Sequence, residues 1–324
     1  MVTDKLARVN IAHLPTPLEP LDQLSHLLGG PDLWIKRDDQ TGLATGGNKT
    51  RKLEFLVADA LAAGADTLIT GGAAQSNHSR QTAAAAARFG LACTLVLKGA
   101  QPSEIQGNLL IDEIVGANIV WAGTEPLDTT MGLVAERLRS EGHRPYIIPY
   151  GGSNPLGASG YIVAMEELMA QCQSKGISFD HIVFASSSGG TQAGMVIGAD
   201  TLSFGGQVLG ISIDLDADSL KSKLVDLANA TVSYLDLRPH YESQSFSVND
   251  CYIGEGYGVF GDLEHNAILT LGRTEGVLLD PVYTGRAFGG LLDMVQRGEI
   301  TKNERVLFWH TGGTSGLFGY AEQF

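Results

Sequence analysis

Short apolar runs alternate with stretches of helical periodicity along most of the chain. The helical periodicity predicts helices over 21–28, from about 49 to 64, and over 76–89, 108–115, 131–140, 157–172, from 191, 219–230, 263–273 and 285–296. The apolar runs predict strands at 33–36, 67–70, 93–97, near 119, and at 146–148, 181–185, 208–213 and 306–310. Strands that alternate with helices predict a parallel sheet covered on both faces. The stretch 232–251 has no clear pattern, and its fold is not predicted.

Four polar or glycine-rich stretches follow segments that we interpret as strands. They are 71–77, 186–191, 283–284 and 311–314, and the third of them follows the apolar residues 277–279. In open α/β sheets, ligands bind beyond the carboxyl ends of the strands. We therefore expect the four stretches to converge on one site.

Three cations crowd the start of the predicted helix that ends near Gly64. Lys49, Arg51 and Lys52 lie at its entry and first turn, although a helix N-terminus already carries a partial positive charge. A bound anion would repair these electrostatics, because free N–H groups at a helix N-terminus attract phosphate. One lysine would then serve as a nucleophile and the other as a phosphate partner. The alternative is a basic helix start that is simply solvated.

The stretch 186–191 is the best candidate for an anion cradle. A loop of small residues between a strand and a helix exposes backbone N–H groups, and its hydroxyls add donors. No Gly-Lys-Ser/Thr follows it, and the loop does not carry the G-x-G-x-x-G pattern of dinucleotide sites. A small phosphorylated cofactor is therefore favoured over a nucleotide. The alternative is an ordinary helix start.

Other polar residues allow both a structural and a functional interpretation. Ser76 or Asn77 could cap the helix that follows, or this helix start could hold a substrate carboxylate. His78 and His310 stand alone, which is more typical of structural, hydrogen-bonded histidines. Tyr283 could stack on a planar ligand or fill the core.

Composition narrows the class of protein. The 324 residues are 44% hydrophobic, which excludes a mainly disordered chain, and a net charge of −14 argues against nucleic-acid binding through a basic surface. No apolar run is long enough to span a membrane, and no apolar signal core is present, so we expect a cytoplasmic location. Cys93, Cys172 and Cys251 show no metal or disulfide spacing. The sequence has no H-E-x-x-H and no G-x-S-x-G, so a metal site or a serine hydrolase has little support.

Taken together, the motifs resemble the D-cysteine desulfhydrase and 1-aminocyclopropane-1-carboxylate deaminase family, within the fold-type II pyridoxal phosphate enzymes. The resemblance runs from about residue 14 to the C-terminus. It rests on PTPLEPL, IKRDD, GGNKTRKLEFL, GGAAQSNHSRQTAA, YGGSNPLGASGY, SSSGGTQAG, EGYGVF, LLDPVYTGRA and HTGGTSGLF. The implied fold is α/β, with two lobes that each contain a mostly parallel sheet flanked by helices. The implied large domain is 1–49 with 162–324, and the small domain is 50–161.

The resemblance implies a residue set for the cofactor, pyridoxal 5'-phosphate. Lys49 would hold it as an internal Schiff base, and Asn77 would bind its ring hydroxyl. Tyr283 would stack on or flank the ring, and Thr284 would face the pyridine nitrogen. The residues expected to hold the phosphate are Lys52, Ser188, Gly189, Gly190 and Thr191.

The resemblance also implies a reaction and a substrate site. Lys49 would move the α-proton, and Ser76, Asn77 and His78 would meet the carboxylate of a small amino acid. Tyr257 would lie close to the reacting atoms, so the implied catalytic set is Lys49, Ser76, Tyr257 and Tyr283. Loss of a β-sulfur group would give pyruvate and ammonia, with D-cysteine as the first expected substrate. L-Cysteate sulfo-lyase, cyclopropane ring-opening deaminase and a non-catalytic amino-acid sensor are the alternatives, and a homodimer is expected.

Three positions depart from the family pattern or divide it. The stretch 257–261 reads YGVFG where the family often has YGVPN, and Arg286 stands where lysine is common. Thr284 occupies the position at which the deaminases carry a carboxylate. A hydroxyl has no charge with which to favour a protonated pyridine ring, so the ring should be a weaker electron sink. This favours a substrate with a good β-leaving group over opening of a carbon ring.

Overall fold

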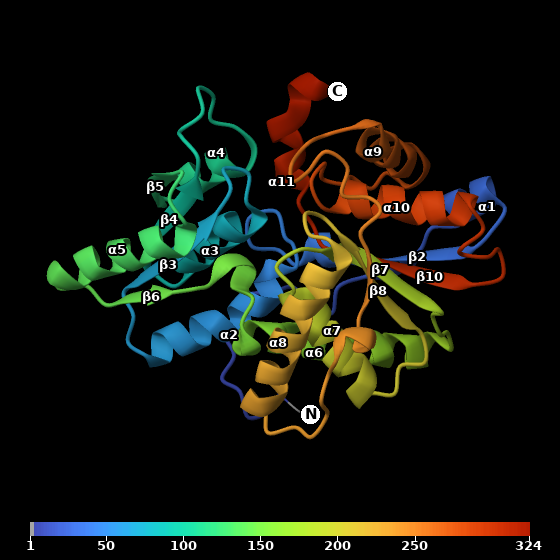
Figure 1. Cartoon of the computed structure of the whole chain (residues 1–324), viewed down its shortest axis with the longest axis horizontal. Helices are drawn as coiled ribbons and strands as arrows, with labels where there is room; N and C mark the ends of the chain where they lie inside the picture. Colours follow the sequence, from blue (N-terminus) through green and yellow to red (C-terminus); the bar gives the residue numbers. More distant parts are fainter. Residues whose placement is uncertain (1–2) are drawn as a thin grey trace.

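Two separate β-sheets organise the chain (Figure 1). The computed structural model describes residues 3–324. The larger sheet has the order β1 (Leu18–Pro20), β2 (Asp32–Arg37), β10 (Arg305–His310), β7 (His181–Ser186), β8 (Gln207–Ser212) and β9 (Ser247–Asn249). The smaller sheet has the order β5 (Asn118–Gly123), β4 (Ala92–Lys98), β3 (Thr67–Gly72) and β6 (Pro145–Ile147). Its pairings are parallel, and in the larger sheet β1 alone runs antiparallel to its neighbour.

Helices cover both sheets. They are α1 (Asp22–Leu28), α2 (Lys49–Ala62), α3 (Asn77–Arg88), α4 (Gly107–Ile114), α5 (Leu127–Ser140), α6 (Pro155–Lys175), α7 (Gly190–Thr201), α8 (Ala217–Tyr234), α9 (Asp262–Glu275), α10 (Thr284–Gln296) and α11 (Thr314–Leu317). The α/β class with two sheets flanked by helices is confirmed. Within 3–324 no helix has the length and apolar character needed to cross a membrane.

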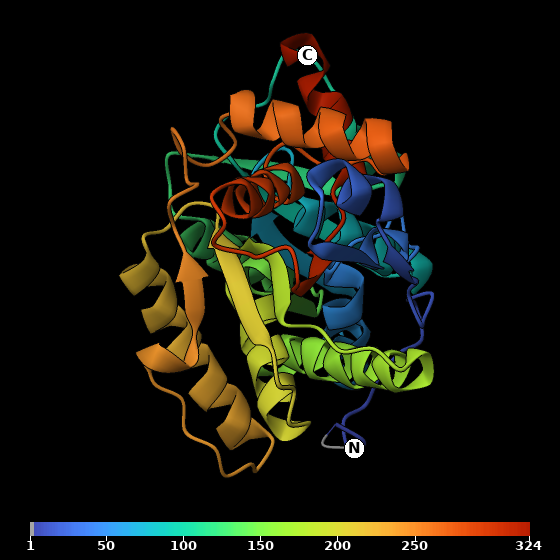
Figure 2. The same cartoon turned by 90° about the vertical axis from the view of Figure 1, so that its right-hand side faces the viewer.

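The larger sheet is buried on both faces because its strands point apolar side chains alternately to two cores. On β10, Val306 and Phe308 pack into the core beneath α9 and α10. Leu307 and Trp309 point the other way, into the core formed with α6 and α7. Figure 2 shows α9 and α10 on one side of this sheet and α6 on the other. A strand buried on both faces reads as a continuous apolar run, which is why β7 and β10 are visible in the sequence.

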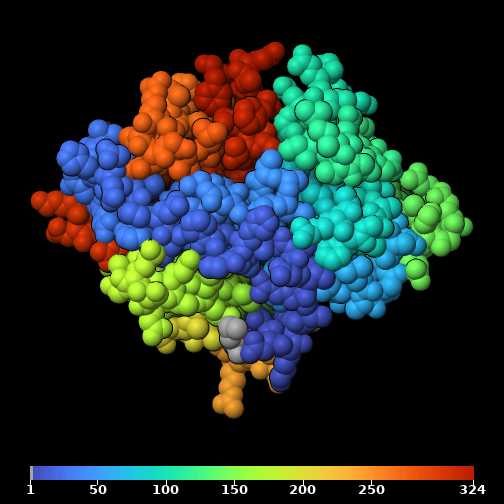
Figure 3. Space-filling view, turned by 180° about the vertical axis from the view of Figure 1, so that it is seen from behind, coloured from blue at the N-terminus to red at the C-terminus, as the bar shows by residue number. Residues whose placement is uncertain are grey.

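The N-terminal segment ties the two parts of the chain together. Seen from behind, it lies in dark blue between the residues of the smaller sheet and α6 (Figure 3). The Val9 amide donates to the Glu54 carbonyl at 2.9 Å. The Thr16 amide donates to the Glu167 carboxylate at 3.0 Å.

Arg51 differs from the two nearby lysines in its contacts, because its guanidinium lies in a buried ionic network. Its guanidinium donates to both carboxylate oxygens of Asp38 at 2.8 Å and also pairs with Glu167 at 2.9 Å. Tyr161 donates a hydrogen bond to Asp38 at 2.6 Å. Burial alone would raise the pKa of Asp38, but the Arg51 guanidinium outweighs it and holds that pKa at about 2. Arg51 is therefore a structural cation that fixes α2 against β2 and α6.

The helix and strand predictions are confirmed with small shifts of their ends, except in two places. The segment 277–279 is not a strand. Val277 and Leu279 are buried in the core beneath α9 and α10 and pair with no strand of the described chain, so apolar character here reflects burial alone. The unassigned stretch 232–251 contains the end of α8 and the short β9. The division into domains at residues 49 and 161 stays a prediction.

We predict that Asp38→Asn destabilises the protein by roughly 3–5 kcal/mol, because it leaves Arg51 buried with one carboxylate fewer. Glu141→Gln is the matched control, since Glu141 forms only an exposed pair with Arg137 at 3.9 Å, worth about 0–1 kcal/mol. Guanidinium unfolding followed by circular dichroism gives both midpoints. Equal midpoints for the two variants would contradict the assignment of Arg51 as a structural cation.

Candidate active site

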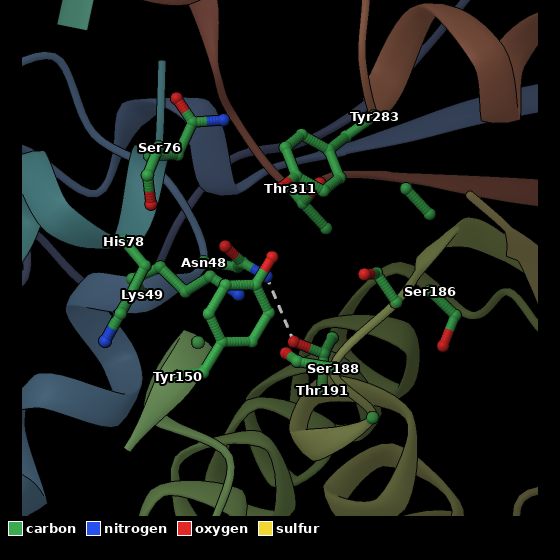
Figure 4. Close-up of a pocket in the computed structure, with 15 residues that line it drawn as sticks. Asn48, Lys49, Ser76, His78, Tyr150, Ser186, Ser188, Thr191, Tyr283 and Thr311 are labelled. Carbon is green, nitrogen blue, oxygen red and sulfur yellow. Dashed lines mark hydrogen bonds between the residues drawn. The ribbon is translucent and has the colours of Figure 1, made fainter. Parts of the chain in front are cut away.

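The strand-following loops meet at one cavity (Figure 4). Its lining comes from the start of α2, the start of α3, the turn after β6, the loop from β7 to α7, and single residues before α10 and after β10. These residues are Asn48, Lys49, Ser76, Asn77, His78, Tyr150, Gly151, Ala185, Ser186, Ser187, Ser188, Gly189, Thr191, Tyr283 and Thr311. The two sheets therefore contribute to the same cavity.

Two lysines without a counter-charge lie near this cavity, Lys49 in its lining and Lys52 beside Gly190 at the start of α7. Lys49 begins α2 and lines the cavity, and burial lowers its pKa to about 8. Lys52 is fully buried, and within the part of the chain that the structure describes its ammonium donates to the Gly151 carbonyl at 3.1 Å and the Ser153 hydroxyl at 3.4 Å. Burial, followed by the charge of Lys49, lowers the pKa of Lys52 well below its ordinary range. Among residues 3–324 no carboxylate forms an ion pair with either ammonium.

The start of α7 forms an anion cradle in front of Lys52. Gly189 precedes the helix with φ of 88°, a left-handed conformation that favours glycine. A Cβ on Gly190 would lie 2.7 Å from the Ser153 hydroxyl and 2.9 Å from the Lys52 ammonium. The side chain of a larger residue would therefore fill the cradle. An N-terminal helix turn facing a buried, unpaired ammonium fits a phosphate group.

Hydrogen bonds fix the walls of this cradle. The Ser153 and Ser188 hydroxyls are 2.8 Å apart, and the Gly190 amide donates to Ser153 at 3.1 Å. Asn48 donates to the Thr191 hydroxyl at 3.0 Å, shown as the dashed line in Figure 4. Sequence reasoning missed Asn48 and Ser153 as site residues. The sequence signal for Ser153 is its place in the motif YGGSNPLGASGY. In the structure, the paired glycines 151 and 152 of this motif both take positive φ.

The start of α3 forms the opposite wall. Ser76 caps this helix by accepting from the Ser79 amide at 3.1 Å, so the structural alternative for Ser76 is present, and the residue also lines the cavity. The Asn77 side-chain oxygen accepts from Arg80 at 3.0 Å. The His78 ring contacts the Thr70 hydroxyl at 2.9 Å. Burial, followed by the charges of both lysines, lowers the pKa of His78 well below its ordinary range, and the imidazole is neutral at pH 7.

Three tyrosines close one side of the cavity. Tyr150 and Tyr283 line it, while Tyr257 lies behind them, with its hydroxyl 2.6 Å from that of Tyr283. The rings of Tyr257 and Tyr283 meet edge to face at a centroid distance of 5.9 Å. Burial raises the pKa of both hydroxyls well above the ordinary value. They are therefore neutral groups that can donate hydrogen bonds to a ligand.

Thr284 lies outside the cavity lining. It is fully buried as the first residue of α10, and its hydroxyl donates to the Asp280 carboxylate at 2.7 Å and accepts from the Asp280 amide at 2.8 Å. The role expected of Thr284 toward a pyridine nitrogen stays a proposal. His310 is a structural histidine, as its isolated position predicts. Its ring accepts from the Gly312 amide at 3.1 Å and contacts the Leu278 carbonyl at 2.9 Å.

The fold and site define an α/β enzyme that holds a phosphorylated cofactor next to a lysine of lowered pKa. The family described as "Pyridoxal-phosphate dependent enzyme" matches residues 9–312, and the chain belongs to this family. The D-cysteine desulfhydrases of Salmonella typhi and Salmonella newport (strain SL254) are 42% identical over 98% of this chain and 97% of their own length. These relatives confirm the more specific resemblance inferred from the sequence.

Solved structures agree with this assignment. A structure described as "Crystal Structure Analysis of the ACC deaminase homologue" superimposes with a TM-score of 0.92, at 39% identity over 99% of this chain and 96% of its own. A processed threonine deaminase isoform from Solanum lycopersicum has a TM-score of 0.67 at 17% identity, over 93% of this chain and 80% of its own, which shows the shared fold alone.

The cofactor is therefore pyridoxal phosphate, and the residues present fit it. Lys52 lacks the counter-charge that a phosphate supplies, and Gly190, the first residue of α7, leaves room for one. Lys49 has the lowered pKa that attack on the cofactor aldehyde requires. Among residues 3–324 no group of three or more His, Cys, Asp or Glu side chains could hold a metal ion.

We predict that cofactor loading depends on pH through Lys49. Its neutral fraction rises as pH increases toward the lowered pKa of about 8, so the rate at which the apoprotein takes up pyridoxal phosphate should fall about tenfold per pH unit below pH 7. Stopped-flow absorbance of imine formation measures this rate. Lys98→Ala, at an exposed lysine, is the control with an unchanged profile. An inflection near the ordinary lysine value would contradict the lowered pKa.

We predict that Thr191→Val weakens cofactor binding at least tenfold. A charge-assisted hydrogen bond to phosphate contributes roughly 1.5–3 kcal/mol, and Asn48 also loses its partner. Equilibrium dialysis of the cofactor measures the change. Thr201→Val removes a hydroxyl from the far end of the same helix and should leave the affinity unchanged. Equal affinities of the two variants would exclude Thr191 from the phosphate site.

Proposed function

We propose that the protein is a carbon–sulfur lyase that converts D-cysteine and water to pyruvate, ammonia and sulfide. The observation that carries the proposal is the lysine pair: Lys49 opens into the cavity with a pKa of about 8, and the unpaired Lys52 faces the anion cradle. Support for the substrate comes from the D-cysteine desulfhydrases that are 42% identical over nearly the whole chain.

Each wall of the cavity has a distinct task in this reaction. Bound pyridoxal phosphate supplies an electron sink for the negative charge that develops at Cα. Lys52 and the start of α7 would hold its phosphate, with the hydroxyls of Ser188 and Thr191 as further donors. Lys49 Nζ would hold the cofactor and, once freed from it by the substrate, take the proton from Cα as a general base.

The substrate would bind between α3 and the tyrosines. Ser76, Asn77 and His78 lie at the start of α3, where helix N–H groups attract a carboxylate, and we assign the amino-acid carboxylate to them. The neutral Tyr283 hydroxyl, hydrogen-bonded to Tyr257, can donate to the departing sulfur. A neutral donor suits a leaving thiolate because negative charge develops on that atom.

Thr284 supports sulfur elimination over cyclopropane deamination. Its hydroxyl has no charge that would keep a nearby pyridine nitrogen protonated. The only carboxylate bonded to it is Asp280, whose oxygens already accept from the amides of Val282, Tyr283 and Thr284. The ring would then be a moderate electron sink, sufficient for loss of sulfide or sulfite. L-Cysteate remains the second candidate substrate, and the 39% identical ACC deaminase homologue keeps ring-opening deamination as a third.

A non-catalytic amino-acid sensor is the less favoured class, because a sensor has no need of a lysine placed to form an imine. We also propose a cytoplasmic homodimer that acts on a small amino acid. The acidic composition, with a net charge of −14, supports the absence of a nucleic-acid partner.

We predict that the holoenzyme releases sulfide and ammonia from D-cysteine faster than it acts on L-cysteate or on 1-aminocyclopropane-1-carboxylate. Separate assays of sulfide, sulfite and ammonia compare the three substrates at equal concentration. Lys49→Ala should abolish all release and the imine absorbance while the circular dichroism spectrum stays unchanged. Dominant sulfite release would make L-cysteate the substrate. Turnover by Lys49→Ala at the rate of the parent would overturn the proposed mechanism.

A further inference from the structure

The loop that carries Tyr257 has little regular structure of its own. Residues 250–261 form turns and irregular backbone between β9 and α9. Their internal backbone hydrogen bonds are long: the Gly256 amide donates to Ile253 at 3.3 Å and the Val259 amide to Gly256 at 3.4 Å. The position of Tyr257 must therefore be fixed by groups outside the loop.

Arg286 supplies two of these outside contacts, one on each side of Tyr257. Its side chain is 1% exposed and lies on α10, which packs against α9 (Figure 1). Nη1 donates to the Gly256 carbonyl at 3.0 Å, and Nη2 donates to the Val259 carbonyl at 2.8 Å. These two carbonyls bracket Tyr257 in the sequence.

The remaining donors of Arg286 tie the loop to the scaffold. Nη1 also donates to the Ile213 carbonyl just beyond β8 at 2.9 Å, and Nε donates to the Glu264 carboxylate of α9 at 2.6 Å. The other oxygen of Glu264 accepts from the Gly261 amide at 3.1 Å, at the end of the loop. One guanidinium thus joins α9, α10 and the end of β8 to both sides of Tyr257.

We propose that Arg286 is a positioning residue that sets the hydroxyl of Tyr257 against Tyr283. The proposal rests on the assigned role of the two tyrosines at the reacting atoms. A planar guanidinium presents five N–H donors in a fixed fork, whereas a lysine ammonium offers three from a single atom. Lysine, common at this position in the family, can keep the charge pair with Glu264 but cannot reach Gly256 and Val259 at once.

The second departure from the family pattern, Phe260, lies in the same loop. Its ring packs at a tilt against that of Phe324 at a centroid distance of 4.9 Å, and the Tyr320 hydroxyl donates to the Gly258 carbonyl at 3.0 Å. Both unusual residues, Arg286 and Phe260, therefore act on the backbone that holds Tyr257. Two departures from the family pattern in or against one loop are consistent with a position of Tyr257 that differs from that in the rest of the family.

The experiment is Arg286→Lys, which keeps the charge beside Glu264 and so limits the cost to folding. We expect kcat for the preferred sulfur amino acid to fall on the order of ten- to a hundredfold, as a displacement near 1 Å can do, with cofactor absorbance unchanged. Hydrogen exchange of the 254–261 amides, measured in the apoprotein, should become faster. Arg273→Lys, at an exposed arginine of α9 whose side chain forms no ion pair among the described residues, should change neither quantity.

A double-mutant cycle separates positioning from a general loss of stability. If Arg286 acts through Tyr257, Arg286→Lys should cost less than threefold in kcat once Tyr257→Phe is present, because effects on one pathway are not additive. Equal losses in both backgrounds, or unchanged exchange of the loop amides, would overturn the proposal. Absence of any sulfur release by the parent would instead reject the proposed function, and the exchange measurement would still test the role of Arg286.

Discussion

A buried ammonium without a carboxylate is the constraint on which this site depends. Lys52 is fully buried, is bonded only to a carbonyl and a hydroxyl, and is one turn along the helix from Lys49. Burying a charge without compensation is unfavourable, and a second cation nearby increases the cost. The arrangement would become favourable with the cofactor phosphate bound at the start of α7, the site that we propose for it. The apoprotein therefore holds an electrostatic imbalance that the cofactor relieves.

The same imbalance explains why Arg51 must be paired elsewhere. Arg51 occupies the same helical turn, but its guanidinium is turned to Asp38 and Glu167 on the far side of α2. That network leaves the two lysines as the cations directed toward the cavity. It also fixes α2 rigidly, and rigid support of a reactive lysine is what productive geometry at Cα requires. Within four residues, the structural cation Arg51 thus lies between Lys49 and Lys52, the two lysines to which we assign roles toward the cofactor.

Much of the fold and of the candidate site could be predicted from the sequence. The periodicity of apolar residues indicates which faces are buried, and polar loops after strands indicate where a ligand binds. The sequence predicts the longer helices and strands, the loop at 186–191 and the lysine stretch, but not the short β1, β9 and α11. The segment 277–279 was not distinguishable from a strand, because an apolar run signals burial whether or not a neighbouring strand exists. Ser153 and Asn48 were missed because hydrogen bonds such as Asn48 to Thr191 join residues 143 positions apart. The local pattern around Arg286 likewise carries no sign of the carbonyls at 256 and 259.

The charge inside the cavity is opposite to that of the protein as a whole. The chain carries a net charge of −14, which disfavours the approach of any anion to its general surface. At the cavity, His78, Tyr257 and Tyr283 are neutral, because burial lowers the pKa of the histidine and raises the pKa of the two tyrosines. Burial lowers the pKa of both lysines as well, and when they are protonated they carry the positive charge near the cavity, in a field that low-dielectric walls strengthen. Neutral walls and protonated lysines would together favour the proposed binding of an amino-acid carboxylate and of the cofactor phosphate at this one place.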